Sequence, residues 1–289
     1  MYGTQAAFER ATEFIKAHGL KIYRICIDDG EGIKTLEFER TNRCNDTYSV
    51  SKAFTMTAAG ILCDRGMLAP DTVIGDVFKK EIASYGDCDP KWDRITLDDV
   101  MRHRIGYEYP FLNIDIDVLD PFRLGSPDFL HLILKEKITG EPGISFAYSD
   151  SAFYLVSRAV TKLTGEKLDD FLLRELFVPL EFREFAWAKC PEGYPMGGTG
   201  LYVSTSDMTK LGRLYLDRGV YGGQRILSEN WIDTVLSRSY EFGSVNSGKG
   251  YAKGGMNGQM LYFSYRDNIS VAWQGCEPSA KSGAMLELF

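Results

Sequence analysis

Two pairs of strand-like runs, placed near opposite ends of the sequence, constrain the fold of this chain most strongly. Near the N-terminus, residues 21–27 (KIYRICI) and 34–40 (KTLEFER) are joined by Asp28-Asp29-Gly30-Glu31-Gly32, which is a hairpin signal. Near the C-terminus, residues 259–265 and 268–274 form a second alternating pair. We therefore expect one antiparallel sheet that is built from both ends of the chain.

Helical patterns accompany these strands and fill the sequence between them. Periodicity and end signals predict helices at 5–18, at 49–65 closed by Gly66, from Ile95 with Thr96 as N-cap, at 128–137, 149–164, 168–177, 205–219 with Ser206 as a possible N-cap, 228–237, and in the tail from 278 to 289. Residues 102–127, rich in Gly, Pro, Asp and aromatic residues, are expected to form an irregular loop over the site.

The predicted fold class is α+β. Its antiparallel sheet, flanked by helices, takes residues 1–45 and 185–289, and an inserted, mostly helical domain takes residues 46–184. Active sites tend to lie in the cleft between two such domains, so we expect the site there.

Charge and hydropathy exclude several classes of function. The formal net charge is -7 and no Lys/Arg-rich run occurs, which argues against nucleic acid as a partner. The first 19 residues lack the basic start and unbroken apolar stretch of a secretory signal, and no run approaches the ~18 apolar residues of a membrane span. We therefore expect a cytoplasmic protein that does not bind membranes.

Neither the cysteines nor the histidines show metal-ligand spacing. The six cysteines are scattered without a C-x-x-C pair and are expected to be reduced thiols, and the three histidines include no H-E-x-x-H. No G-x-S-x-G elbow occurs, and neither a Walker A motif nor a G-x-G-x-x-G follows a strand. We expect neither a metal nor a cofactor.

Ser49 and Lys52 form a candidate catalytic pair. On a helix, residues three apart share one face, with about 5–6 Å between their Cβ atoms. A lysine at that distance can act as the base that makes a serine nucleophilic. Ser51 is excluded as the nucleophile because it is adjacent to Lys52 and points to another face. Taken alone, the pair is also compatible with a helix start that carries a solvated lysine.

Two later stretches offer partners for such a serine. Tyr148, in Phe146-Ala147-Tyr148-Ser149-Asp150, stands at the head of a helix and could relay a proton. Lys253-Gly254-Gly255 precedes the second strand pair and could give a binding edge with a fixed positive charge and close backbone approach. In isolation, each also reads as ordinary structure: a packed tyrosine before a helix cap, and a glycine-rich turn with a surface lysine.

Ser-x-x-Lys, Tyr-x-Asp and Lys-x-Gly, in this order, resemble the serine β-lactamase and penicillin-binding-protein superfamily. The pattern is most similar to its class C-like branch, which includes AmpC-type β-lactamases, D-amino-acid peptidases, family VIII esterases and 6-aminohexanoate-dimer hydrolase. Residues 95–106, 141–154, 198–208 and 227–231 resemble further segments of that branch, so the resemblance runs from about residue 20 to residue 275.

The resemblance implies a role for each residue of the site. Ser49 would be the acylated nucleophile, Lys52 its general base, and Tyr148 the group that passes the proton to the leaving group and helps activate water. Lys253 and Gly255 would line the binding edge, and the N–H groups of Ser49 and Met256 would form the oxyanion hole.

Two departures from the pattern bear on the substrate. Asp150 stands where many relatives have an amide that hydrogen-bonds the substrate, and Lys-Gly-Gly replaces Lys-Thr-Gly, which removes a hydroxyl near a substrate carboxylate. We expect a serine hydrolase that acts through an acyl-enzyme on a small ester or amide, peptide-like or containing a D-amino acid, with at most weak β-lactamase activity. The alternatives are a catalytically silent relative that binds or is acylated without efficient turnover, and an unrelated α+β protein with coincidental motifs.

Overall fold

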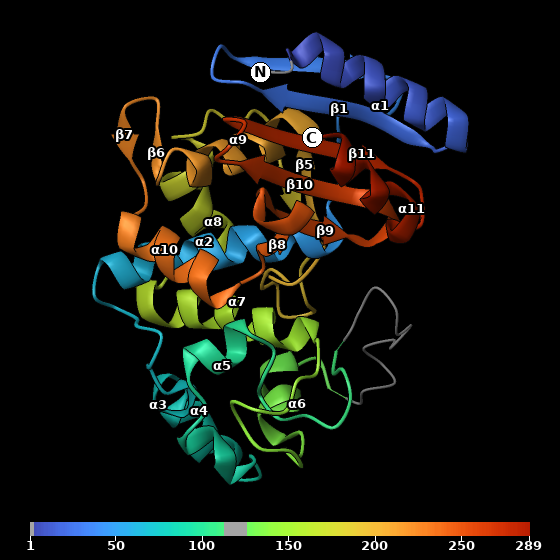
Figure 1. Cartoon of the computed structure of the whole chain (residues 1–289). Helices are drawn as coiled ribbons and strands as arrows, with labels where there is room; N and C mark the ends of the chain where they lie inside the picture. The colour runs from blue at the N-terminus through green and yellow to red at the C-terminus, as the bar shows by residue number, and fades with distance from the viewer. Residues whose placement is uncertain (1–2, 113–125) are drawn as a thin grey trace. The chain divides into compact units, whose positions relative to one another are not determined.

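The computed structural model describes residues 3–112 and 126–289, which form two compact units (Figure 1). Unit 1 comprises residues 1–53, 176–186 and 201–289, and unit 2 comprises residues 54–175 and 187–200. Half of the predicted loop at 102–127, residues 113–125, lies outside the described residues.

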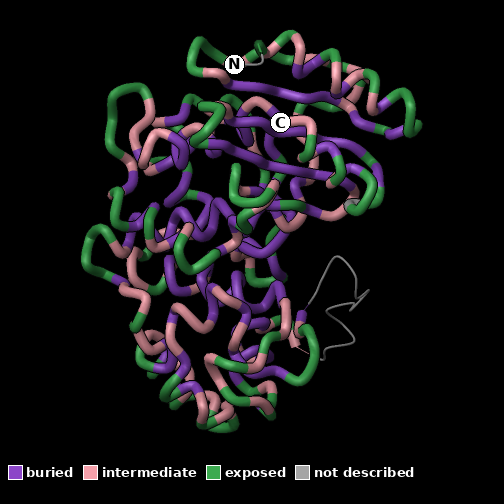
Figure 2. The backbone as a smooth tube through the Cα atoms, viewed as in Figure 1, coloured by how far each residue is buried: buried purple, intermediate pink, exposed green. Residues whose placement is uncertain are grey.

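Unit 1 is built on a six-stranded antiparallel sheet with the order β2-β1-β11-β10-β9-β8. Strands from the two ends of the chain meet at its centre, where Ile25 of β1 pairs with Trp273 of β11. The strands are β1 (Ile22–Asp28), β2 (Ile33–Glu37), β8 (Gly243–Val245), β9 (Gly250–Gly255), β10 (Gln259–Ser264) and β11 (Ile269–Gly275). Figure 2 shows the central strands as buried along nearly their whole length.

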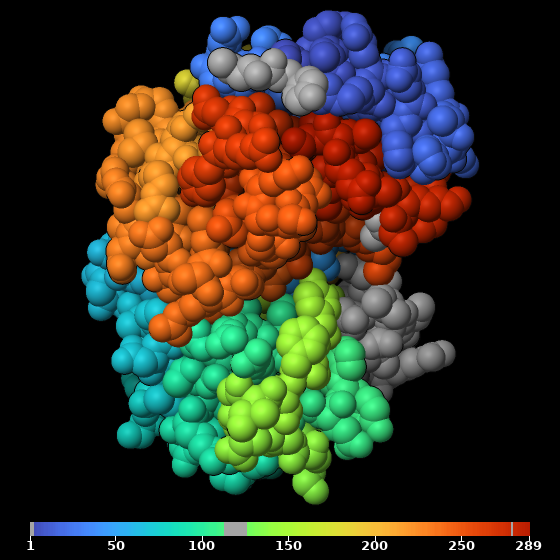
Figure 3. Space-filling view, viewed as in Figure 1, coloured from blue at the N-terminus to red at the C-terminus, as the bar shows by residue number. Residues whose placement is uncertain are grey.

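The two faces of this sheet differ in chemistry. One face is apolar: Ile25, Ile27 and Trp273 pack against Ala11 and Ile15 of α1 (Thr4–His18), as alternation along the strands predicts. Arg10 of α1 also donates to the backbone oxygen of Leu288, and α1 lies beside the C-terminal residues of the chain (Figure 3).

The opposite face of the sheet carries buried polar side chains that bond to α9 (Thr205–Leu216). Gln274 accepts from the hydroxyl of Thr205 at 2.7 Å, and Ser270 donates to the backbone oxygen of Thr209 at 2.7 Å. Buried polar groups need such partners. These hydrogen bonds fix the position of α9 on the sheet more narrowly than apolar contact alone would.

The remaining elements of unit 1 are short. They are β3 (Cys44–Asp46), which pairs with β5 (Leu201–Ser204), the hairpin of β6 (Val220–Tyr221) and β7 (Gln224–Arg225), α10 (Glu229–Arg238), α11 (Ser279–Gly283), and the 3₁₀ turns η1 (Tyr48–Val50), η4 (Asn246–Gly248), η5 (Met256–Gly258) and η6 (Ala284–Leu288). The unit boundary falls inside β4 (Ala186–Trp187), which joins the small sheet of β3 and β5, and inside α2 (Ser51–Asp64).

Among its described residues, unit 2 is mostly helical, and its longest helix is α7 (Asp150–Thr164), where ten of fifteen residues are buried. Around it the chain forms α3 (Ile74–Val77), α4 (Lys79–Tyr85), the 3₁₀ turn η2 (Pro90–Asp93), α5 (Leu97–Met101), α6 (Phe129–Lys135) and α8 (Leu168–Leu172), the last continued by a π-helical turn over Leu173–Phe177. The predicted cap at Thr96 is confirmed: its hydroxyl accepts from Asp99 N–H, and the Asp99 carboxylate accepts in return.

The α+β fold with an antiparallel sheet built from both chain ends is confirmed. The predicted cap of the helix at 205–219 is wrong, because Ser204 and not Ser206 accepts from Asp207 N–H. Ser204 has the extended backbone of an N-cap, whereas Ser206 already lies inside the helix. The sequence pattern also did not predict β8, which forms the sixth strand of the sheet, beside β9.

We predict that Ser204→Ala lowers the free energy of unfolding by about 1 kcal/mol, because it removes the cap of α9. Ser206→Ala is the matched control and should cost less than about 0.5 kcal/mol. Urea unfolding of both variants checks this. A larger loss for Ser206→Ala would contradict the assignment of the cap.

Candidate active site

Ser49 and Lys52 lie side by side in unit 1. The Nζ atom of Lys52 donates to Oγ of Ser49 at 3.2 Å. Ser49 belongs to the 3₁₀ turn η1 and is partly exposed, whereas Lys52, in the first turn of α2, is completely buried. The pair therefore combines a reachable hydroxyl with an amine held away from bulk water, as nucleophilic catalysis by serine requires.

Hydrogen bonds to Leu201 fix the chain on both sides of Ser49. Thr47 donates to the backbone oxygen of Leu201 through both its N–H and its hydroxyl, each at 2.9 Å. The hydroxyl of Ser51 accepts from Leu201 N–H at 3.1 Å and lies 3.1 Å from that of Thr47. Because Ser51 is buried and makes these hydrogen bonds, it helps to position Ser49, which lies two residues before it.

The strand that carries Lys253 passes directly over this segment. A Cβ atom built on Gly255 would lie 2.3 Å from the backbone oxygen of Thr47, closer than any side chain allows. Glycine is thus required by the approach of the protein's own backbone. Residues two apart in a strand share a face, so Lys253 lies on the same face of β9 as Gly255, toward Thr47. Pairing with β8 ends at Ala252, so Lys253–Gly255 extend past the end of that strand.

A second connection joins η1 to the turn that follows β9. Nδ2 of Asn257 donates to the phenolic oxygen of Tyr48 at 2.9 Å. Both residues have left-handed backbone, with φ of 56° at Asn257 and 46° at Tyr48, which is unusual for a bulky residue. Tyr48 precedes Ser49 and Asn257 follows Met256, so this bond ties together the two backbone segments whose N–H groups are the predicted oxyanion donors.

Lys253 forms an ion pair with Glu241, which precedes β8. The side chains of the pair are 10% and 3% exposed, so the pair is largely shielded from water. The sequence predicted a fixed positive charge at Lys253. The structure adds a carboxylate that neutralises it.

Tyr148 and Asp150 belong to unit 2, at the start of α7. Tyr148 is partly exposed and lies against the ring of His103, with ring centroids 4.3 Å apart. Nδ1 of His103 accepts from Ser149 N–H at 3.2 Å, and its backbone oxygen accepts from Ala147 N–H at 2.9 Å. His103 therefore holds the residues on both sides of Tyr148 and the tyrosine ring itself.

Asp150 is 1% exposed and occupies the first turn of α7, where the helix dipole favours a negative charge. Its backbone is also closely packed, because a Cβ atom on Gly198 would lie 3.0 Å from the Cα and Cβ atoms of Asp150. The residue preceding it, Ser149, is at the N-cap position but uses its hydroxyl to bind the backbone of Ala147 and Phe111.

Residues 40–273 match the beta-lactamase family. The chain belongs to this family. Among curated proteins it is 24% identical over 209 residues to the 6-aminohexanoate-dimer hydrolase of Paenarthrobacter ureafaciens, a match that covers 65% of this chain and 50% of that protein. The chain thus spans about half the length of the curated relative it matches.

Solved structures agree on the fold of the family. A protein from Bacteroides dorei described as a candidate beta-lactamase matches with a TM-score of 0.79 and 15% identity, over 100% of this chain and 98% of that one. A D-stereospecific amidohydrolase from Streptomyces sp. matches with a TM-score of 0.71 and 17% identity, over 98% and 97% of the two chains. The predicted resemblance to the β-lactamase and penicillin-binding-protein superfamily is confirmed.

Five of the seven predicted site residues belong to unit 1 (Ser49, Lys52, Lys253, Gly255 and Met256), and two belong to unit 2 (Tyr148 and Asp150). That the two sets form one beta-lactamase-type site stays a prediction from the sequence. The motifs gave no role to Tyr48, His103, Glu241 or Asn257, which bind or orient the predicted residues. Only His103 had a signal, since it lies in a segment similar to the family pattern.

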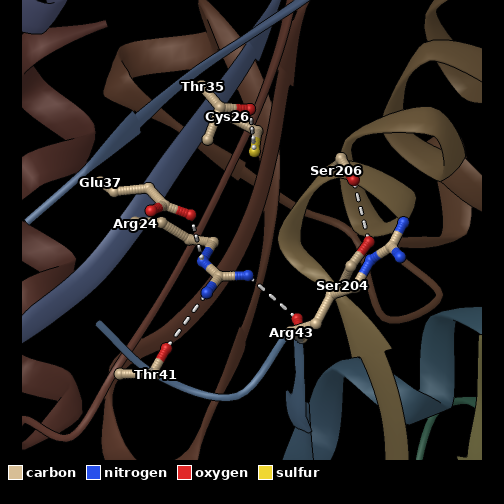
Figure 4. A pocket seen from close by; sticks show the side chains of 8 residues that line it. All are labelled: Arg24, Cys26, Thr35, Glu37, Thr41, Arg43, Ser204 and Ser206. Atoms are coloured by element: carbon tan, nitrogen blue, oxygen red, sulfur yellow. Dashed lines mark hydrogen bonds and ion pairs between the residues drawn. The ribbon is translucent and has the colours of Figure 1, made fainter. Parts of the chain in front are cut away.

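A separate polar cavity of about 380 Å³ lies in unit 1, away from the predicted residues of the beta-lactamase motifs (Figure 4). Arg24 crosses it and donates to the backbone oxygens of Asn42 and Arg43 and to the hydroxyl of Thr41. The thiol of Cys26 also lines it, and burial raises the pKa of that thiol to about 11, so it is protonated at neutral pH. The contacts of Arg24 hold β1 to the chain before β3.

Within residues 3–112 and 126–289, no cluster of His, Cys, Asp and Glu side chains could hold a metal ion. In the same ranges, no helix is both long and apolar enough to cross a membrane.

We predict that Gly255→Ala lowers the free energy of unfolding by about 1–3 kcal/mol, since the added methyl group would force β9 away from Thr47. Gly254→Ala is the matched control, because a Cβ atom there comes no closer than 3.4 Å to any atom, at the end of the Met260 side chain. Denaturant unfolding checks both variants. Equal losses for the two would show that the contact with Thr47 does not limit residue 255.

Proposed function

We propose that this protein is a serine hydrolase that forms an acyl-enzyme on Ser49 and acts on a small ester or amide. The observation that carries the proposal is the 3.2 Å hydrogen bond between the buried amine of Lys52 and the partly exposed hydroxyl of Ser49. The membership of the beta-lactamase family supports it, as do the hydrolase names of the matched relatives.

In the proposed reaction, Lys52 accepts the proton of the Ser49 hydroxyl while Oγ attacks the carbonyl carbon of the substrate. The N–H groups of Ser49 and Met256 stabilise the negative oxygen that develops. Tyr148 passes a proton to the departing alcohol or amine as its bond to the carbonyl carbon breaks. Water then attacks the acyl-serine, which releases the acid and restores the hydroxyl.

This role requires that Lys52 be uncharged when it acts as the base. Burial disfavours the charged form of an amine because the ammonium group loses its hydration. Lys52 has no exposed surface, and its neighbour Ser51 is hydrogen-bonded to Thr47 and Leu201. This burial supports the proposal that Lys52 acts as the base.

The proposed substrate class is peptide-like or D-amino-acid-containing, in line with the 6-aminohexanoate-dimer hydrolase and the D-stereospecific amidohydrolase that the chain resembles. We propose that Lys253 and Gly255 line the binding edge and that Asp150 faces the substrate. A carboxylate at 150 accepts hydrogen bonds but donates none, so it would disfavour penicillin-like acylamide side chains. β-Lactam hydrolysis is then expected to be weak.

A catalytically silent relative is the second candidate, and the two departures at Asp150 and Lys253-Gly254-Gly255 favour it. Such a protein would bind or be acylated without efficient turnover. Intact-mass measurement during incubation with 4-nitrophenyl butyrate separates the two candidates. A persistent adduct with no sustained product release identifies the silent relative, whereas multiple turnovers identify the hydrolase.

We predict that Ser49→Ala abolishes covalent labelling by a fluorophosphonate probe, because the mutant lacks the nucleophile. Ser51→Ala is the matched control, and it should still be labelled since that hydroxyl binds Leu201 and Thr47. Labelling is followed by in-gel fluorescence and intact mass. Full labelling of Ser49→Ala would place the nucleophile elsewhere.

We further predict that Lys52→Met slows acylation by about 10²–10⁴-fold, the usual contribution of a general base. Methionine keeps most of the buried volume, so circular dichroism should be unchanged. Lys210→Met is the control, because Lys210 is also shielded but pairs with Asp207. Stopped-flow rates of labelling check this, and an unchanged rate in Lys52→Met would assign the base to another group.

A further inference from the structure

Glu241 is held in place more firmly than a surface carboxylate would be. Its neighbours Tyr240 and Phe242 are both buried, Tyr240 beside Trp231 and Phe242 edge-on to Tyr215 and Phe263. Glu241 itself has left-handed backbone with φ of 53°. A strained backbone between two anchored aromatic residues is maintained only when its surroundings fix it.

The carboxylate held in this way meets Lys253. The loop that carries Glu241 leads into β8, which pairs with β9 up to Ala252, the residue before Lys253 (Figure 1). The ammonium and carboxylate groups form an ion pair with side chains 10% and 3% exposed. Two charges that are shielded from water in this way interact strongly, so removing the carboxylate changes the net charge at Lys253 substantially.

We propose that Glu241 determines specificity by neutralising Lys253, so that the binding edge accepts substrates without a carboxylate next to β9. This rests on the proposed function, which places the substrate along Lys253–Gly255. A lone lysine there would attract a substrate carboxylate, whereas a lysine already paired offers such a group little net attraction and presents it with a second negative charge. The substrate class is thereby narrowed to esters or amides that are uncharged in the part lying along β9.

Two pairs of esters test this, each pair differing by one charge. The first, 3-(butanoyloxy)benzoate and 3-(butanoyloxy)benzamide, carries the difference on the alcohol part. The second, 4-nitrophenyl 4-carboxybenzoate and 4-nitrophenyl 4-carbamoylbenzoate, carries it on the acyl part. Product release gives kcat/KM for each ester, and intact mass gives the acylation rate. Both are measured at high salt, which screens the formal net charge of -7.

The wild type should prefer the neutral member of each pair. Glu241→Gln should shift the ratio toward the anionic member by about tenfold in at least one pair, because it removes the negative charge that is paired with Lys253. Glu229→Gln is the matched control: it removes one exposed carboxylate from unit 1 and should shift neither ratio. The double variant Glu241→Gln/Lys253→Gln should lose the shift, which separates charge release from a general structural change.

A shift by Glu241→Gln no larger than that by Glu229→Gln in both pairs would overturn the inference. A wild type that prefers the anionic ester of either pair would also overturn the inference. This comparison needs no variant, so it decides the question even where Glu241→Gln fails to fold. Wild-type protein that acts on no ester and resists the fluorophosphonate probe would overturn the proposed function, and this inference with it.

Discussion

The close approach of the Thr47 carbonyl to the backbone of Gly255 is the contact on which the arrangement of unit 1 depends. It is possible only because residue 255 has no side chain. On its other side the Thr47 segment is bound by Leu201, the first residue of β5, through three hydrogen bonds that also include Ser51. Ser49 and Lys52 follow directly in the chain. The backbone that carries both residues is therefore positioned by contacts with the main chain of two strands, β5 and β9.

Hydrogen bonds also position the sheet behind this segment. Gln274 of β11 donates to the backbone oxygen of Val203 in β5 and accepts from Thr205. One buried amide therefore joins the central sheet to β5 and to helix α9. The face toward α1 is held by apolar packing, which tolerates small shifts. Directional bonds are concentrated on the face that supports the candidate nucleophile, and apolar contacts on the face away from it. The division follows from what each interaction fixes: hydrogen bonds fix angle and register, whereas burial fixes proximity.

The sequence predicted the features that depend on short-range pattern. β-rich runs around a hairpin signal located β1 and β2, alternation located β10 and β11, and the N-cap at Thr96 was predicted. What it missed depends on contacts distant in the chain. β8 has only three residues, too few for a period to show, and the choice of Ser204 over Ser206 depends on where the helical backbone begins. The left-handed backbone of Tyr48 and the partnership of Glu241 with Lys253 leave no local signature, since each exists only once remote segments meet. For the same reason the motifs named the residues of the site and could not name those that hold them.

The pairing of β1 with β11 has a consequence for how the protein is made. β1 leaves the ribosome long before β11, which is one of its two neighbours in the sheet. Until then its apolar face is covered only by α1, and its edge is open to any other strand. Such long-range pairing slows folding. Ser49 and Lys52 can form their turn of helix early, but β9, the strand that packs against Thr47, is synthesised much later. In the nascent chain, Ser49 therefore lacks the contact of its segment with β9, and that contact forms only when the sheet is completed.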